Sequence, residues 1–421
     1  MKQNQRNNND TETMEEVNNS ADTGEGARRI NLVLVLIVIA VFAAAAAATW
    51  FHFRTKTYKG YKVVSENETA YDSTAEYIVF SDNLLKYTMD GVSYINKGGD
   101  IVWTAGINMN SPKAVARGDY AVVADMRGNS VCVFDREGEV SNLTMPFTIC
   151  DVDIAKQGAF AVVLESDKTN YINLYNKLGE LVYEMQTTID KSGYPLDISI
   201  SEDGKKLFTS YISVGASGIE NRLAAYNFGD VGQNSNADRM VGGYKMEDET
   251  VAKLCFVDND TVVAFGTSTI STYSMKELPD RRAVIELNKP VRSIFYDSEI
   301  IGFVQETNEL VTGTDTDAED AAHKYKVTAY SLKGNKIFEK YIDFDYENVS
   351  ANKGELIVTG GSECLVLRSN GTVKFSGKLD GHIVSMVPGA GKNEYVVVYD
   401  TRTELIKLKA GANKVTKEEE N

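Results

Sequence analysis

The stretch PKAVARGDYAVVADMRGNSVCVFDREGEVSNLTMP, residues Pro112–Pro146, carries the prediction of the fold. It divides into four short segments, PKAVARGD, YAVVAD, SVCVFDREGE and VSNLTMP, and turn-forming Gly, Asp and Asn residues separate their apolar runs. Short alternating or fully apolar runs bounded by such residues indicate strands joined by tight turns. No helical period of any length interrupts this pattern from Tyr58 onward, so the unit predicts a four-stranded antiparallel sheet.

The same unit recurs along the chain with a period of about 44 residues. A repeated four-stranded unit is the blade of a β-propeller, so the repeat predicts an all-β, eight-bladed β-propeller over residues 60–411. Seven blades is the alternative, because the first unit is the least regular, and a large β-sandwich would give no reason for a repeat. The expected first strands begin near Tyr77, Pro112, Phe147, Pro195, Val251, Pro290, Asn348 and His382.

The last unit contains only three strands before the polar tail at 412–421. An open last blade would expose an unpaired strand edge. The run GYKVVSE, residues Gly60–Glu66, precedes the first unit and has strand character. We therefore expect it to return as the outer strand of the last blade.

The run INLVLVLIVIAVFAAAAAATWF, residues Ile30–Phe51, is uncharged and almost entirely apolar. About 20 such residues cross a ~30 Å hydrocarbon core as a helix, and Trp50 and Phe51 end the run as an interfacial aromatic belt would. We predict a disordered cytoplasmic tail at 1–27, a transmembrane signal-anchor helix at 28–52 and a linker at 53–59. A cleaved signal peptide is the alternative, since the alanine run Ala43–Ala48 offers cleavage sites.

The orientation of this anchor is argued from flanking charge. Arg28 and Arg29 precede the apolar run, whereas four basic residues follow it within 54–62, and that count alone favours a cytoplasmic propeller. Long domains, however, translocate largely regardless of charge, and an arginine pair abutting the run suits a signal-anchor. We therefore expect a single-pass protein of the cell membrane with the amino terminus in the cytoplasm and the propeller outside.

Three short segments resemble known propeller repeats. GGDIVWTA (Gly98–Ala105) resembles the ending of quinoprotein-type repeats, whose family includes outer-membrane assembly scaffolds, and DISISEDGKKLF (Asp197–Phe208) resembles the hairpin of WD-repeat and TolB-like propellers. Gly381-His382 resembles the glycine–histidine pair of WD repeats, but Tyr399-Asp400 stands where Trp-Asp would follow.

The whole chain from Ile30 to Gly411 resembles an uncharacterised clostridial family of membrane-anchored propellers, catalogued as a domain of unknown function. The segments LLKYTMDGVSYINKGGDIVW and SPKAVARGDYAVVAD carry this resemblance, together with the polar tail and the single apolar helix. It implies an anaerobic Gram-positive source and no known activity, so it supports the fold and leaves the chemistry open.

Composition excludes several classes of ligand. Acidic residues outnumber basic ones, 60 to 44, for a net charge of −16, which disfavours nucleic acid and anionic lipid. Three histidines and four scattered cysteines leave little for a metal site or a disulfide scaffold. Trp50 and Trp103 are too few to stack a quinone, and no glycine-rich loop follows a strand and opens a helix to bind a nucleotide. We expect no cofactor and no metal.

Two further features have unremarkable interpretations. The acidic segment Asp315–Asp320 could offer oxygen ligands to Ca²⁺, but it lacks the EF-hand spacing, and a solvated loop is the favoured interpretation. The cysteines lie on apolar strand-like runs and are expected to be buried free thiols. A disulfide between Cys132 and Cys150 is the alternative if the domain lies outside the cell.

Loops between the second and third strands of each blade are the expected binding surface, because propeller loops on one face converge on the central channel. Arginines there could recognise carboxylates on a peptide or a cell-wall polymer. The candidate partner-binding residues are Asp125, Arg127, Asp167, Arg222, Asp400 and Arg402.

These observations favour a non-enzymatic scaffold, tethered outside the membrane, that binds protein or cell-envelope partners. The alternative is an extracellular glycan-active hydrolase or lyase that uses channel carboxylates, and a third possibility is a sensor acting through a partner. Buried channel carboxylates with raised pKa values would favour the enzyme, whereas a channel filled by aliphatic side chains would favour the scaffold.

Overall fold

The computed structural model of the chain describes residues 34–45, 55–68, 72–167, 169–189, 192–215, 218–307 and 323–411. The chain divides into two compact units, Met1–Lys56 and Thr57–Asn421. Each unit is a separate body, and the larger one contains all the named strands.

The first unit contains a helix over residues 34–45, and its apolar side chains are exposed, Phe42 at 73%. Within the described ranges, no helix combines the length and the apolar character needed to cross a membrane. Residues 28–33 and 46–52 of the expected membrane helix lie outside those ranges, as do the two tails at 1–27 and 412–421.

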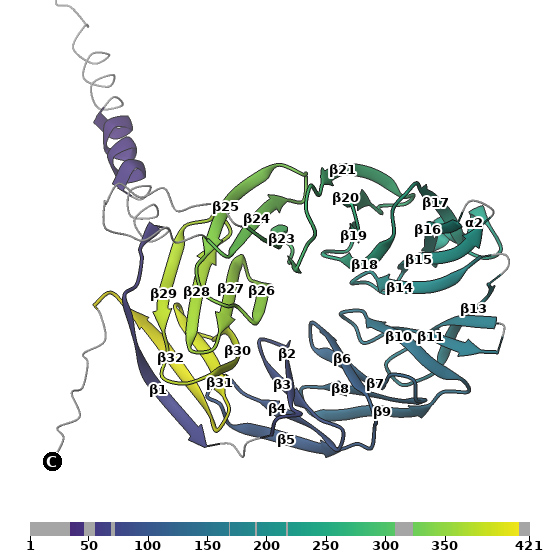
Figure 1. The fold of residues 1–421 in the computed structure, drawn as a ribbon, viewed down its shortest axis with the longest axis horizontal. Helices are drawn as coiled ribbons and strands as arrows, with labels where there is room; N and C mark the ends of the chain where they lie inside the picture. The colour runs from purple at the N-terminus through teal and green to yellow at the C-terminus, as the bar shows by residue number, and fades with distance from the viewer. Residues whose placement is uncertain are drawn as a thin grey trace, which may run out of the picture. The chain divides into compact units, whose positions relative to one another are not determined.

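The second unit consists of eight four-stranded antiparallel sheets, here called blades 1 to 8. Figure 1 shows them in a ring, with the first strand of each blade innermost and the fourth outermost. Blades 1 to 4 are β2 (Glu76–Phe80), β3 (Asn83–Tyr87), β4 (Gly91–Ile95) and β5 (Ile101–Gly106); β6 (Pro112–Arg117), β7 (Tyr120–Asp125), β8 (Ser130–Asp135) and β9 (Gly138–Thr144); β10 (Thr148–Ile154), β11 (Phe160–Ser166), β12 (Thr169–Tyr175) and β13 (Leu181–Thr188); and β14 (Tyr194–Ile200), β15 (Lys206–Gly215), β16 (Gly218–Asn227) and β17 (Met240–Met246).

Blades 5 to 7 repeat this order, and blade 8 takes its outer strand from the other end of the chain. The short helix α2 (Asp230–Ser235) lies in the connection between β16 and β17. The remaining strands are β18 (Val251–Phe256), β19 (Thr261–Gly266), β20 (Thr269–Ser274) and β21 (Asp280–Glu286); β22 (Ser293–Tyr296), β23 (Ile300–Glu306), β24 (Tyr325–Ser331) and β25 (Lys336–Ile342); β26 (Asn348–Asn352), β27 (Glu355–Gly360), β28 (Glu363–Arg368) and β29 (Val373–Lys378); and β30 (Ile383–Pro388), β31 (Glu394–Tyr399), β32 (Arg402–Lys409) and β1 (Gly60–Glu68).

This architecture confirms the prediction of eight blades and excludes the alternative of seven. The observed first strands begin within about three residues of the eight expected positions, the largest difference being between Pro290 and Ser293. The apolar core is divided among the blades, since each cluster of buried side chains lies between two successive blades. A four-stranded sheet has two faces to cover, and the ring arrangement covers both with neighbouring sheets.

Ring closure depends on β1, which pairs antiparallel with β32 from Gly60↔Lys409 to Glu68↔Arg402. This confirms that the run after the linker returns as the outer strand of the last blade. The residues just before β1 add a second connection, to blade 7. The Tyr58 backbone N–H donates to the Lys374 carbonyl at 2.8 Å, and the Tyr58 hydroxyl accepts from Asn393 Nδ2 at 2.7 Å.

Deleting residues 1–69 is expected to destabilise the propeller, whereas deleting residues 1–56 leaves β1 and Tyr58 in place. The longer deletion removes the β1–β32 ladder and exposes the β32 edge, and each lost hydrogen bond costs about 1 kcal/mol. Urea unfolding followed by tryptophan fluorescence, with Trp103 retained in both proteins, measures the difference. Equal unfolding midpoints for the two deletions would contradict this account of closure.

Candidate functional site

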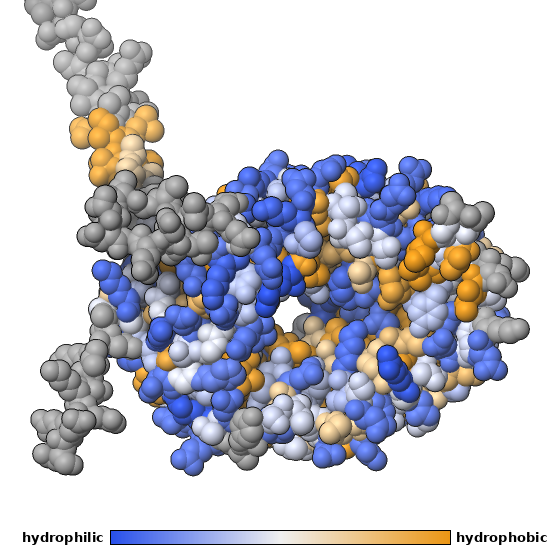
Figure 2. Space-filling view, in the orientation of Figure 1, coloured by the Kyte–Doolittle hydropathy of each residue, from blue (hydrophilic) through white to orange (hydrophobic). Residues whose placement is uncertain are grey.

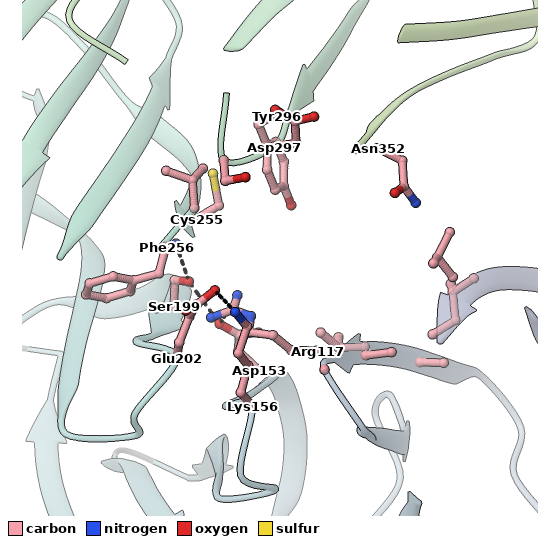
Figure 3. A pocket seen from close by; sticks show the side chains of 18 of the residues that line it. Arg117, Asp153, Lys156, Ser199, Glu202, Cys255, Phe256, Tyr296, Asp297 and Asn352 are labelled. Carbon is pink, nitrogen blue, oxygen red and sulfur yellow. Dashed lines mark hydrogen bonds and ion pairs between the residues drawn. The ribbon is translucent and has the colours of Figure 1, made fainter. Parts of the chain in front are cut away.

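One end of the central channel contains a cavity with a volume of about 790 Å³. Its walls come from the innermost strands of blades 1 to 7 and from the turns that join first to second strands. Figure 2 shows the opening at the centre of the ring, so aliphatic side chains do not fill the channel. Figure 3 shows polar and charged side chains around the cavity, among them Arg117, Asp153, Glu202 and Asp297.

The channel wall of blades 3 to 5 is held together by side chains that bond the next blade's backbone. Asp151 accepts from the Ile198 N–H at 3.1 Å, and Asp153 accepts from the Ile200 N–H at 2.8 Å. Asp197 accepts from the Leu254 N–H at 2.6 Å in the same way. An innermost strand has no partner strand on its channel side, and these carboxylates satisfy the N–H groups left there.

Ser199 continues this pattern. Its hydroxyl accepts from the Phe256 N–H at 3.0 Å and donates to Asp153 at 2.9 Å (Figure 3). The sequences DVD at 151–153 and DIS at 197–199 repeat a polar residue every second position, which places both polar side chains on one face of a strand. That alternation was visible in the sequence, but its role depended on which blade stands next.

Each of the three wall aspartates also has a cation beside it. Lys113 Nζ lies 2.7 Å from Asp151, Lys253 Nζ lies 2.8 Å from Asp197, and Arg117 lies 3.5 Å from Asp153. The aspartates are at most 9% exposed. A buried carboxylate without a cation or hydrogen bonds would be strongly destabilising, so these pairings keep the wall stable.

Burial raises the pKa of Asp197 to about 7, and the negative charge of Asp151 contributes, while the Lys253 ammonium opposes the shift. Burial acts to lower the pKa of Lys253, but the Asp197 carboxylate outweighs it and raises that pKa. Each charge favours the ionised form of the other, so the two groups titrate as a pair rather than independently.

The carboxylates that line the cavity itself are also partnered. Asp153 belongs to the wall described above, and Asp297 accepts from the Ile300 and Gly354 N–H groups at 2.9 and 3.0 Å. The other three bind cations: Lys353 to Asp82 at 2.6 Å, Arg136 to Asp119 at 2.6 Å and Lys156 to Glu202 at 2.7 Å. The cavity is therefore rich in charge but carries little net charge.

Tyr296 and Cys255 extend the lining on the side of blades 5 and 6. The Tyr296 side chain keeps 36% of its surface exposed, and it points into the cavity in Figure 3. Burial raises the pKa of the Cys255 thiol well above its usual range, so this cysteine is not a nucleophile at neutral pH.

The structure distributes the predicted partner-binding residues over four blades. In blade 2, Asp125 is buried and accepts from the Asn110 and Ser111 N–H groups at 3.0 and 2.8 Å, so it shapes its own loop. Arg127 of the same loop is exposed and has a φ of 66°. Asp167 in blade 3 is exposed.

The other three predicted residues make ion pairs. Arg222 lies within β16 and not in the expected loop, because the β15–β16 hairpin extends to Gly215 and Gly218; it lies 3.1 Å from Glu220 and is 52% exposed. Asp400 lies 3.3 Å from His382 Nδ1. Arg402 lies 2.6 Å from Glu404, and its guanidinium stacks 4.3 Å from the centre of the Tyr399 ring.

Other sequence expectations have mixed outcomes. Cys132, Cys255 and Cys364 are buried free thiols as expected, and Cys150 is half-buried and also free, so the suggested Cys132–Cys150 bridge is not formed. Among the described residues no cluster of His, Cys, Asp or Glu could hold a metal ion. The acidic segment at 315–320 lies outside those residues.

The chain belongs to a family of unknown function, DUF5711, whose model matches residues 54–408. No curated protein matches its sequence. BamB and Sqt1 are two of the solved structures that share the fold. BamB from Moraxella catarrhalis has 14% sequence identity and a TM-score of 0.50 over 83% of this chain and 100% of its own. Sqt1 from Saccharomyces cerevisiae has 10% identity and a TM-score of 0.53 over 84% of this chain and 100% of its own.

Replacing Lys253 by Met is expected to destabilise the propeller by about 3 kcal/mol or more at alkaline pH, where Asp197 is ionised and would be left buried without its cation. The double variant K253M/D197N should recover most of that loss, since no charge then remains at the site. The free energies of unfolding of the wild type, both single variants and the double variant, measured in urea, form a double-mutant cycle. A double variant whose loss equals the sum of the single losses would show that the two residues do not interact.

The Asp197 carboxyl is expected to make the stability of the propeller depend on pH. Its pKa of about 7 lies above the unfolded value of 3.8, so the folded chain holds this proton more tightly. That contribution is complete below about pH 4 and is lost as the pH rises through about 7. The free energy of unfolding should therefore fall from pH 5 to pH 8 more steeply in the wild type than in D197N. Identical slopes would contradict the assignment.

Proposed function

We propose that this member of the DUF5711 family is a membrane-tethered propeller scaffold that binds protein or cell-envelope partners on the outer face of the membrane. The observation that carries the proposal is the pairing of every carboxylate in the channel wall and cavity lining described above. Most of those groups bond the neighbouring blade, as Asp151, Asp153, Asp197 and Glu202 do, and this supports the ring as a rigid platform. Loops and blade surfaces are then available for partners, as in other proteins with this fold.

The tether is the part of the proposal that rests on sequence. The apolar run Ile30–Phe51 has the length and composition of a single membrane-spanning helix. A tag is placed after Asn421, and protease is added to intact cells whose wall has been removed. If the propeller is external, the protease should digest the tag. Protection of the tag until lysis would place the propeller in the cytoplasm.

A glycan-active hydrolase or lyase is the second candidate, and one observation favours it. Asp197 has a pKa near 7 beside an open, polar channel, and a carboxyl poised near the working pH suits general acid–base catalysis. Against it, the Asp197 carboxylate is buried and is held by Lys253 and the Leu254 N–H. Release of reducing ends from cell-wall glycan by the wild type, and not by D197N, would favour the enzyme.

Partner capture is expected to depend on Arg127 in the β7–β8 loop, Arg222 in β16 and Arg402 at the start of β32. Serine substitution of Arg127, Arg222 and Arg402 together removes three guanidinium groups that can recognise carboxylates, and it should abolish recovery of partners after chemical cross-linking in cells. The double variant R127S/R222S keeps the Arg402 contacts with Glu404 and should lose most of the capture. Arg282→Ser removes an exposed arginine paired with Asp280 and serves as the control. Unchanged capture by the triple variant would refute this role for the arginines.

A further inference from the structure

Blade 4 contains a groove of about 460 Å³ beside Arg222, away from the channel. Its residues come from the outer strands β15, β16 and β17, and Ser192 of the turn between β13 and β14 completes it. The groove has a simple origin in the pairing of β16 with β17. Ala224 stands opposite Gly243, so at this pair only a methyl group covers the two backbones.

Larger residues flank this small pair on both sides. Tyr226 stands opposite Met240 at one end, and Arg222 stands opposite Lys245 at the other. A side chain at position 243 is not tolerated, because its Cβ would lie 2.4 Å from the Leu223 carbonyl oxygen. The groove is therefore a fixed feature of this sheet, with an apolar end and a basic end.

Two tyrosines make the apolar end uncharged. The hydroxyls of Tyr211 and Tyr226 lie 3.0 Å apart and hydrogen-bond to each other. Both rings are at most 5% exposed, and burial raises the pKa of each hydroxyl, so neither ionises at neutral pH. Together with Ala224 and the half-buried Met240 they belong to the apolar core between blades 3 and 4, and the groove opens onto the edge of that core, where an apolar side chain can pack.

The basic end has an excess of positive charge. Arg222 and Lys245 share one carboxylate, that of Glu220, at 3.1 and 3.6 Å. The Arg222 hydrogen bond and the Lys245 charge lower the pKa of Glu220, so it stays ionised, and the three groups together carry one net positive charge. Both cations are more than half exposed. At short range, within the screening length of about 8 Å, this local excess attracts a carboxylate in spite of the chain's net charge of −16.

We propose that this groove binds an extended segment of a partner protein that places an apolar side chain over the Ala224–Gly243 pair and a carboxylate on Arg222 and Lys245. The carboxylate is either an Asp or Glu side chain or the partner's own carboxyl terminus. This inference rests on the proposed scaffold function and gives one of its predicted residues, Arg222, a defined surface. Charge complementarity favours an acidic segment, and the short gap between the apolar and basic ends requires the two groups to be adjacent.

The test uses three short peptides and the full-length chain, kept in mild detergent because of its apolar run. The first peptide contains Leu-Glu between Gly and Ser residues with both ends blocked, the second replaces Glu by Gln, and the third ends in Leu with a free carboxylate. Binding is followed by NMR of the Ala224 and Met240 methyl groups. The first or the third peptide, or both, should shift both methyl signals, and which of them does so identifies the source of the carboxylate.

The Gln peptide and the double variant R222E/K245E should each weaken binding by about tenfold or more, since a charge-assisted hydrogen bond contributes about 1.5–3 kcal/mol. The matched control is R282E, because Arg282 pairs with Asp280 at the same 3.1 Å distance and the same sequence spacing. The control should bind as the wild type does. Circular dichroism and unfolding midpoints confirm that each variant is folded.

Several results would overturn the groove assignment. These are no methyl shift with any peptide at millimolar concentration, equal binding of the Glu and Gln peptides, or full binding by R222E/K245E. Self-association that R222E/K245E abolishes would assign the groove to a second copy of the chain, and vesicle binding with the same dependence would assign it to lipid. Partner capture that survives R222E/K245E would leave the scaffold function standing without this groove.

Discussion

The propeller depends on closing the ring, because an array of separate sheets is stable only when every sheet has a neighbour on both faces. The first and last blades are far apart in sequence and must be joined by something other than chain order. Here β1 joins them by pairing with β32, and Tyr58 adds a hydrogen bond to the Lys374 carbonyl of blade 7. The amino-terminal segment is thus part of the last blade, and an attachment at that end of the chain would act directly on the closing strand.

Ring closure does not pair the innermost strands on their channel side, so each of these strands keeps one edge whose backbone N–H and C=O groups have no partner strand. Around blades 3 to 5 side chains take the place of that partner, since Asp151, Asp153 and Asp197 accept hydrogen bonds from the backbone of the following blade. Their negative charge then needs compensation, which nearby lysine and arginine side chains provide. Many charged groups near the channel thereby have a structural role in joining the blades.

The groove in blade 4 has a different origin from the channel wall. It lies over a pair of small residues that leave the face of the sheet uncovered. The Ala224–Gly243 pair leaves space on the face of a sheet, and Arg222 and Lys245 share a single carboxylate at its edge. Each channel cation described above pairs with its own carboxylate, whereas Arg222 and Lys245 share a single one. The channel cations are therefore neutralised within the structure, and one positive charge in the groove is available to a ligand. The similarity to BamB and Sqt1 is limited to the fold and does not indicate a partner. The class of partner therefore has to be inferred from surface features such as this groove.

The amino-acid sequence by itself determined the repeat, the eight blades and the return of β1 to the last blade, because alternating strands and turn residues are local properties that recur in phase. It also showed that Asp197 and Ser199 alternate along one strand. It did not show that Asp197 meets Lys253, or that Ala224 stands opposite Gly243, because those contacts join residues 56 and 19 positions apart through register and ring geometry. Pairing across blades and strands is a property of the assembled ring, and only the tertiary structure decides it.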